Sequence, residues 1–204
     1  MLRFDSEQLT AKEHYKMLIG SIIPRPVALV TTLSQNKVLN AAPFSYFNII
    51  SSDPPMVSIS VQRQEGKQKD TARNAAAAGE FVVHIADETY AEGMNATAAG
   101  LPSDESEVDQ AGLTPIESTH VQIPGLAEAH IRMECKLVQM ITLGGTDEKP
   151  AADLLIGRIV CYHISEELYD ERGYIDPKKL KPLSRLAGNS YATLGRIFEL
   201  QRPR

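Results

Sequence analysis

Residues 63 to 74, RQEGKQKDTARN, bring together the groups that proteins use to bind a phosphate. The segment leads from an expected strand into an expected helix, so unpaired backbone N–H groups should stand at the helix start. Its side chains add three cations and a hydroxyl, from Arg63, Lys67, Lys69 and Thr71. These groups stabilise a phosphate dianion, although Asp70 would repel it unless its carboxylate faces away and caps the helix. A solvated basic loop has the same composition, and the residues alone leave both interpretations open.

A second segment, NAAPFSYFNIISSDPPMVSISVQ at residues 40 to 62, carries more small polar side chains than a core strand needs. Its asparagines and serines, with backbone amides held irregularly by proline, could line a flat polar heterocycle. The rings of Phe44, Tyr46 and Phe47 could wall such a ligand. The alternative is a core strand followed by a Ser/Asp-Pro-Pro turn, with the aromatic rings packing in the interior.

A third segment, SRLAGNSYATLG at residues 184 to 195, offers Asn189, Ser190 and Tyr191 beside the flexible Gly188. On its own it is equally typical of C-terminal packing. The spacing of the chain shows no carboxylate pair, no Ser-His-Asp set, no reactive-cysteine context and no metal-binding His or Cys pattern. A protein with a phosphate and heterocycle site but no acid–base machinery is expected to take its chemistry from a cofactor.

The elements that must position these segments are mostly extended. In MVSISVQ, Val57, Ile59 and Val61 alternate with polar neighbours, which predicts a half-buried strand. Further strands are predicted within residues 80–86, 130–141 and 154–164. Many short strands with few helices between them favour a closed β-barrel or a sandwich. A doubly wound sheet is disfavoured, because it needs a helix after nearly every strand and usually a GxGxxG turn, which this chain lacks.

Two helices are expected at defined places, and a further short one is expected within DETYAEGMNATA, residues 87–98. One follows the capping box formed by Thr10 and Glu13 and stops at Gly20. The other lies within DTARNAAAAGE, capped by Asp70 or Thr71 and ended by Gly79. Residues 100–113 and 146–153 are polar and are expected to be surface excursions.

Composition narrows the class of protein. The 204 residues carry a net charge of −5, which disfavours non-specific nucleic-acid binding. No apolar run approaches the length of a membrane span, and the N-terminus has no signal-like apolar region, so a cytoplasmic location is expected. Cys135 and Cys161 are expected to be buried free thiols.

The three segments in this order resemble the flavin reductase-like family of FMN-binding split barrels, which includes flavoredoxins and the reductase components of two-component flavin monooxygenases. The resemblance rests on PRPVALVTT, NAAPFSYFNIISSDPPMVSISV, KDTARNAAAAGEFVVHI and SRLAGNSYATLG. It implies a mostly β fold, a six-stranded Greek-key split barrel with short peripheral helices. The chain would be one domain over residues 1–204, with a helical extension at 1–20 and a C-terminal segment, 165–204, packing back on the barrel. A homodimer with FMN near the subunit interface is also implied.

The resemblance also assigns candidate cofactor contacts. Those beside the flavin ring would be Asn40, Ala41, Phe44, Ser45, Phe47 and Asn48. Those near the phosphate would be Ser60, Arg63, Lys69, Asp70 and Thr71, with Thr31 and Arg25 as further candidates. Tyr191 and its neighbours would close the pocket. The chain has no tryptophan, an indole that some flavoredoxin-like members place near the flavin, so Phe44, Tyr46 or Phe47 would take that position.

Three functions fit this site. The first is an NAD(P)H-dependent FMN reductase in which hydride transfer is carried out by the cofactor, without a catalytic side chain or a metal, and reduced flavin passes to a partner monooxygenase. The second is a flavoredoxin-type electron-transfer protein that holds FMN tightly and exchanges electrons with a protein partner. The third is a cofactor-free β-barrel binding module.

Overall fold

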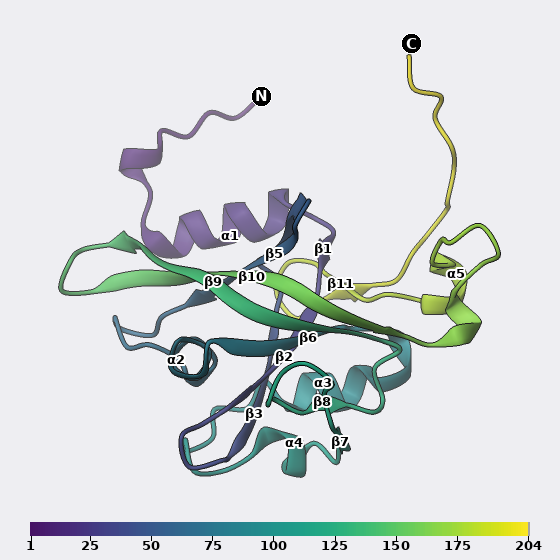
Figure 1. The fold of residues 1–204 in the computed structure, drawn as a ribbon. Coiled ribbons are helices and arrows are strands. Elements are labelled where there is room, and N and C mark those ends of the chain that lie inside the picture. Colours follow the sequence, from purple (N-terminus) through teal and green to yellow (C-terminus); the bar gives the residue numbers. More distant parts are fainter. Residues whose placement is uncertain (204) are drawn as a thin grey trace.

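The computed structural model describes residues 1–203, and its centre is a curled sheet of seven antiparallel strands (Figure 1). The strands lie in the order β3-β2-β6-β9-β10-β5-β4. Their bounds are β2 Ala28–Leu33, β3 Leu39–Phe44, β4 Phe47–Ser52, β5 Pro55–Gln62, β6 Glu80–Ile85, β9 Ile131–Gly145 and β10 Pro150–Ile164. The predicted mostly β class is confirmed, with seven strands in this sheet where six were expected. The count differs because residues 39–52 form two strands, separated at Ser45 and Tyr46.

The two outermost strands, β3 and β4, follow one another in the chain and are joined only by Ser45 and Tyr46. So short a connection between opposite edges requires the sheet to curl until its edges meet, as in a barrel. The amide of Ser60 on β5 donates to the carbonyl of Tyr46 at 2.8 Å and holds this corner. The residues expected to bind a heterocycle therefore lie at the seam of the barrel.

The barrel interior is filled by the apolar faces of its strands. Val57, Ile59 and Val61 are buried, as their alternation predicts, and they belong to the same core cluster as Phe81. Gly157 of β10 faces that ring, because a Cβ atom at this position would lie 2.3 Å from Cζ of Phe81. The glycine is therefore required by the close approach of an aromatic side chain.

Helix α2, Asp70–Ala78, packs against the barrel through Ala72 and Ala75, which are fully buried in the core. It ends at Gly79 in the left-handed conformation, with φ at 70°, as predicted. The expected cap at its start is wrong. Lys69 occupies the N-cap position, and no side chain accepts a hydrogen bond from the first turn.

The N-terminal helix α1, Ala11–Ser21, begins at the predicted capping box of Thr10 and Glu13. It continues one residue beyond Gly20, where the sequence predicted its end. Ile19 is buried beneath the helix, whereas Tyr15 and Leu18 are about half exposed.

Two small sheets and several short helices surround the barrel (Figure 1). β1 Arg25–Pro26, β11 Ser184–Arg185 and β12 Tyr191–Ala192 form one sheet, and β7 Pro115–Ile116 pairs with β8 Gly125–Leu126. The short helices are η1 Ser6–Gln8, η2 Glu88–Tyr90, α3 Ala91–Ala96, α4 Glu107–Gln110, η3 Glu166–Leu168 and α5 Pro177–Leu180. A second apolar cluster, with Leu29, Met94 and Val108 among its members, joins α3 and α4 to β2.

The C-terminal segment packs back on the body only in part. Leu180 and Leu183 are buried, and β11 pairs with β1. Residues 193–203 have no regular structure. The first part of this segment borders a hollow beside α5, and the end of the chain extends away as a tail (Figure 1). The predicted division into a barrel with two extensions, the second packing back on the barrel, stays a prediction.

Among the described residues, no helix combines the length and the apolar character needed to cross a membrane.

Candidate functional site

A groove runs along strand β3, the start of helix α2 and the C-terminal segment. It comprises three adjoining hollows of about 610, 890 and 190 Å³, which share Pro43, Phe44 and Lys69 in their walls. We call it the β3–α2 groove; hollows of this size are typical of small-molecule sites. Nine of the predicted contacts line it: Arg25, Asn40, Phe44, Ser45, Ser60, Lys69, Asp70, Thr71 and Tyr191.

The start of α2 presents unpaired amides and a free cation to this groove. The carboxylate of Asp70 forms an ion pair with Arg73 at 2.6 Å, so its charge is committed to the helix surface. Lys69 is exposed, and among the residues described its ammonium group has neither an ion-pair nor a hydrogen-bond partner. A helix start that no side chain caps and that carries a free lysine is suited to an anion.

A buried polar network holds the helix start against β3. The amide nitrogen of Asn40 donates to both carboxylate oxygens of Glu107 at 3.0 Å. The amide oxygen of Asn40 accepts hydrogen bonds from the hydroxyls of Thr71, at 3.1 Å, and Thr32, at 3.2 Å. The backbone N–H of Ala41 also donates to Glu107, at 3.2 Å. Burial raises the pKa of Glu107, and these hydrogen bonds oppose the rise.

At the other end of the groove, the buried guanidinium of Arg25 joins three chain segments. It donates to the carbonyls of Ile19, at 2.9 Å, and Ile22 on the α1 side. It also donates to the carbonyl of Leu186 in the C-terminal segment, at 2.9 Å. Its Nε is buried and has no hydrogen-bond partner among the residues described. Arg25 therefore holds this end of the groove together, and one of its N–H groups is left without a partner among the described residues.

The C-terminal segment supplies the wall opposite β3. The guanidinium of Arg185 lies over the ring of Tyr191, 4.4 Å from its centre, and donates to the carbonyl of Gly188. This cation–π contact fixes the tyrosine at the rim, where Asn189 also lines the hollow. Tyr191 therefore lines the groove, and its predicted role in closing a cofactor pocket stays a prediction.

Three predicted contacts do not reach the groove. Thr31 is fully buried, and its hydroxyl donates to the carbonyl of Pro124 at 2.7 Å. Ala41 is fully buried on the side of β3 that packs with the second apolar cluster. The guanidinium of Arg63 binds both carboxylate oxygens of Asp153, at 2.9 and 2.6 Å, and also the carbonyl of Gly66. Arg63 therefore stabilises the loop before α2 rather than presenting a free cation.

Phe47 and Asn48 lie in a separate hollow of about 390 Å³ beside the end of α1. This hollow also contains Leu18 and Ile22 and touches the groove at Ser45. Asp70, Asn40 and Thr71 line the groove, but their polar groups already have protein partners.

Some residues of the site escaped the sequence analysis. Glu107 lies in a segment that was expected to be a polar surface excursion, yet Glu107, Val108 and Leu113 are buried. A signal was present: Ser106 precedes a short helical pattern, and Gly112 follows it with a positive φ of 66°. Arg185 also lines the groove, although only Asn189, Ser190 and Tyr191 were predicted to do so from residues 184–195.

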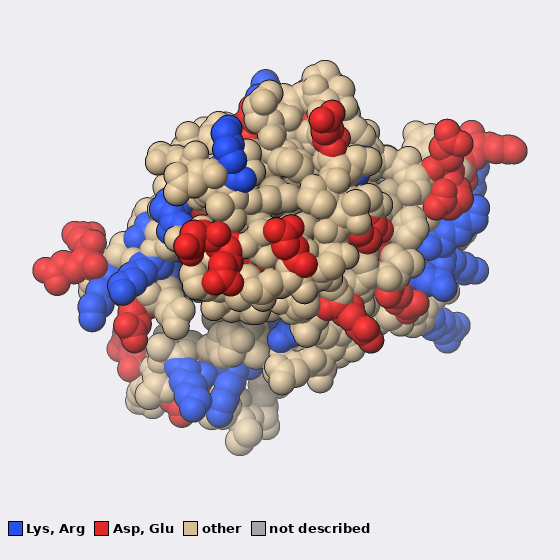
Figure 2. All heavy atoms as spheres, turned by 90° about the horizontal axis from the view of Figure 1, so that it is seen from below, with Lys and Arg blue, Asp and Glu red and all other residues tan. Residues whose placement is uncertain are grey.

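The surface on the side of α4 and β7 carries both signs of charge. Figure 2 shows acidic side chains across the middle of this face, with many of the basic side chains toward its two sides. The groove itself is lined by both signs of charge, with Lys67, Lys69 and Arg185 as basic residues and Glu65, Asp70, Glu92 and Glu107 as acidic ones.

Known proteins resemble this chain along nearly its whole length. A model of the flavin reductase like domain matches residues 19–184. YwrF of Bacillus subtilis, described as an uncharacterized protein, is 56% identical over 204 residues, covering all of both chains. Nitrilotriacetate monooxygenase component B from Bacillus cereus is 56% identical, with a TM-score of 0.96 over 98% of each chain. The 2-nitrobenzoate 2-nitroreductase NbaA of Pseudomonas fluorescens is 32% identical, with a TM-score of 0.88 over 99% of this chain and 96% of its own.

Flavoredoxin of Desulfovibrio vulgaris (Miyazaki F) is 24% identical, with a TM-score of 0.75 over 88% of this chain and 91% of its own. At this identity the likeness concerns the fold alone.

The buried network predicts a pH-dependent defect in Asn40→Asp, which places two carboxyl groups in contact. One of them must stay protonated in the folded state, so the pair's folded pKa lies above its unfolded value of about 4. A group of this kind destabilises the fold as pH rises through the unfolded pKa. We expect the variant to lose about 2–4 kcal/mol of unfolding free energy, relative to wild type, between about pH 4 and pH 7.

Urea denaturation at several pH values measures this loss. Asn48→Asp is the matched control, because Asn48 is exposed and the same charge there should leave the pH dependence close to that of wild type. A pH-independent difference between Asn40→Asp and wild type would show that the Asn40–Glu107 contact is not buried as described.

Proposed function

The chain belongs to the flavin reductase-like family, and we propose that it binds FMN in the β3–α2 groove and uses it to oxidise NADH or NADPH. The observation that carries the proposal is the start of α2. There, no side chain caps the helix, and the one cation at its N-cap, Lys69, has no partner among the described residues. The groove beside it is walled by Phe44 and by residues of the barrel seam.

The phosphate end fits the first turn of α2. Its free N–H groups and the ammonium group of Lys69 would bind the dianion, with Lys67 at the rim of the same hollow. Asp70 does not obstruct this, because its carboxylate pairs with Arg73. The hydroxyl of Thr71 is already donated to Asn40, so it positions the helix start rather than binding the ligand.

The ring end fits the seam between β3 and β4. Phe44 offers an apolar face in all three hollows, and Ser45 and Ser60 offer hydroxyls beside it. Arg25 lines the same hollow as these two serines, and its guanidinium holds together the chain segments that form this end of the groove.

Bound FMN would supply the hydride acceptor that the protein's side chains lack. The residues of the groove then need only bind, orient and shield the ring. Phe44 and Tyr191 would limit access of water from two sides, and Arg185 would hold Tyr191 in place. Hydrogen-bond donors at the seam would stabilise negative charge that develops on the polar edge of the ring.

The reduced flavin or its electrons would pass to a protein partner. The similarity to nitrilotriacetate monooxygenase component B supports a partner monooxygenase, since that protein is named as one component of such an enzyme. An electron-transfer protein is the alternative recipient, in keeping with the flavoredoxin-type function considered above.

Lys69→Ala should weaken FMN binding and leave riboflavin binding nearly unchanged. The ammonium group would contact only the phosphate, and a charged hydrogen bond contributes about 1.5–3 kcal/mol, which corresponds to roughly 10- to 200-fold in Kd. Quenching of flavin fluorescence measures both constants. Lys178→Ala, an exposed lysine outside the groove, is the matched control. Equal losses for FMN and riboflavin would place the phosphate elsewhere.

The reductase activity is tested by adding NADH or NADPH to the FMN-loaded protein without oxygen. We expect the absorbance of oxidised flavin to disappear faster than it does with free FMN, because the groove orients both rings. Flavin that stays oxidised with both nicotinamides, but is reduced by dithionite, would contradict the reductase and favour flavoredoxin-type electron transfer. Protein that takes up no flavin would contradict both.

A homodimer is the expected assembly, and exposed apolar residues beside the groove support it. Ile22 and Ile49 are 60% and 74% exposed, and the hollow that contains Ile22 and Phe47 adjoins the groove at Ser45.

Light scattering should give a mass twice that of one chain. Ile49→Lys should shift the measured mass toward that of one chain and should weaken FMN binding. Val138→Lys, also exposed on a strand, is the control. If the wild-type protein is a monomer, or if Ile49→Lys remains a dimer, the proposed interface is contradicted.

A further inference from the structure

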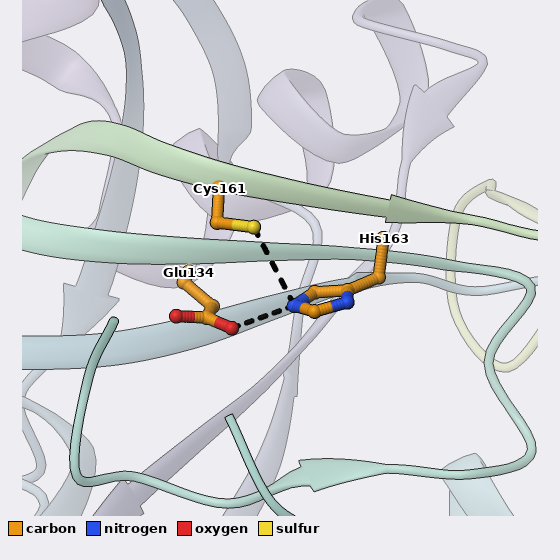
Figure 3. A group of neighbouring side chains, drawn as sticks. All are labelled: Glu134, Cys161 and His163. Carbon is orange, nitrogen blue, oxygen red and sulfur yellow. Dashed lines mark hydrogen bonds and ion pairs between the residues drawn. The ribbon is translucent and has the colours of Figure 1, made fainter. Parts of the chain in front are cut away.

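A cluster of three metal-binding side chains lies between β9 and β10, away from the β3–α2 groove. Glu134 of β9 is the cross-strand partner of Cys161 on β10, and His163 follows two residues later. Figure 3 shows that their side chains point toward one another. One ligand atom from each, a carboxylate oxygen, Sγ and Nε2, lies within 4.8 Å of the others. None of the three side chains lines the groove.

We propose that Glu134, Cys161 and His163 form a binding site for one Zn²⁺ ion. Thiolate, imidazole and carboxylate are the ligand types that zinc takes in proteins, and the soft thiolate disfavours Mg²⁺ and Ca²⁺. Three protein ligands leave a fourth, tetrahedral position for water. The site could not be predicted from sequence spacing, because its residues form no CxxC or HxxxH pattern and meet only through the pairing of β9 with β10.

One of the distances between these ligand atoms already suits a small tetrahedral ion, and a second must lengthen. With zinc bonds of the usual length, neighbouring ligand atoms lie roughly 3.2–3.8 Å apart. Sγ of Cys161 is 3.7 Å from Nε2 of His163, which already meets this requirement. Nε2 of His163 is 2.6 Å from Oε1 of Glu134, where the two atoms share a proton. For zinc to bind Nε2, the neutral imidazole of His163 would carry its proton on Nδ1, and the thiol proton of Cys161 would leave to solvent. The Nε2 and Oε1 atoms would then move apart by about half an ångström or slightly more.

Glu134 is held in place for this role before any ion binds. Its side chain is fully buried, and it accepts hydrogen bonds from the backbone N–H groups of Thr119, at 2.7 Å, and His120, at 2.6 Å. Burial alone would raise the pKa of Glu134, but these bonds and His163 lower it, so the carboxylate stays charged. Such fixed hydrogen bonds to a carboxylate ligand are typical of the surroundings of metal ligands.

The cluster is open to solvent on one side and is held by a packed loop on the other. Cys161 and His163 are partly exposed, so an ion can enter from solvent. Val121 and Ile123 are buried against the barrel and anchor the loop that donates to Glu134. Arg132 lies opposite His163 in the register, and its charge opposes a cation. One thiolate and one carboxylate outweigh this single positive charge. An ion bound here would tie the 117–124 loop to β9 and β10.

The cobalt spectrum tests the site, since Co²⁺ replaces Zn²⁺ and gives a charge-transfer absorbance only with a thiolate ligand. We expect the full-length protein, freed of metal by a chelator, to show this band, saturating at one ion per chain and abolished by excess Zn²⁺. Cys161→Ser should remove the band, leaving Cys135 as the remaining thiol. His163→Gln should weaken binding about tenfold or more, because even the loss of a residue that only supports a metal ligand costs about 10- to 100-fold in affinity. His14→Gln, an exposed histidine on α1, is the control.

A measurement on the wild-type protein avoids any folding defect in the variants. Zn²⁺ at one equivalent should slow alkylation of Cys161 by iodoacetamide, as followed by mass spectrometry, and a chelator should restore the rate. It should also raise Tm in wild type but not in Cys161→Ser. A cobalt band that persists in Cys161→Ser, binding that never saturates, or an alkylation rate unaffected by zinc would overturn the proposal.

Discussion

The buried amide of Asn40 links strand β3 to the start of helix α2, and the shape of the groove depends on this link. Its nitrogen donates to Glu107, and its oxygen accepts from Thr71 and Thr32. A buried amide with all of these partners can adopt one orientation only, because any rotation leaves polar groups unpaired. Position 40 therefore sets where the first turn of α2 begins, and with it where an anion can bind.

The rest of the site follows from this placement and from the barrel seam. Asp70 and Arg73 neutralise each other on the helix surface, which leaves Lys69 as the free charge at the helix start. The abrupt connection at Ser45 and Tyr46 closes the barrel and brings small polar groups beside Phe44. The protein thus separates positioning, done by buried hydrogen bonds, from binding, done by groups that the fold leaves unpaired. This division suits a protein whose chemistry comes from a cofactor.

Much of this could be predicted from the sequence where the signal is local. The alternation in β5, the capping box at Thr10 and the glycine that ends α2 each follow from short-range rules. Nine of the contacts that the resemblance implies line one groove, and their contact with FMN stays a prediction. Pairs of residues far apart in the chain could not be predicted: nothing near Arg63 shows that it pairs with Asp153, 90 positions away. Likewise, the short helical pattern around Glu107 does not show which residue it would contact, and its partner Asn40 lies 67 positions earlier.

The start of α2 also shows that short-range rules are not sufficient. Asp70 and Thr71 are both good capping residues, and propensity alone favours either of them. The structure uses both side chains elsewhere, on Arg73 and Asn40, so the helix start is left open. A local rule is overridden here at the position that the proposed function needs, which is where departures from such rules are expected.

The measurement that tests the central claim most directly compares the Kd values of FMN and riboflavin for the wild-type chain. These ligands share the ring and differ in the phosphate, so the ratio isolates the open start of α2. The account predicts that FMN binds more than tenfold tighter, a difference of about 1.4 kcal/mol or more, and that the advantage shrinks as salt is added. Equal affinities would contradict it, because the uncapped helix and Lys69 would then contribute nothing to binding.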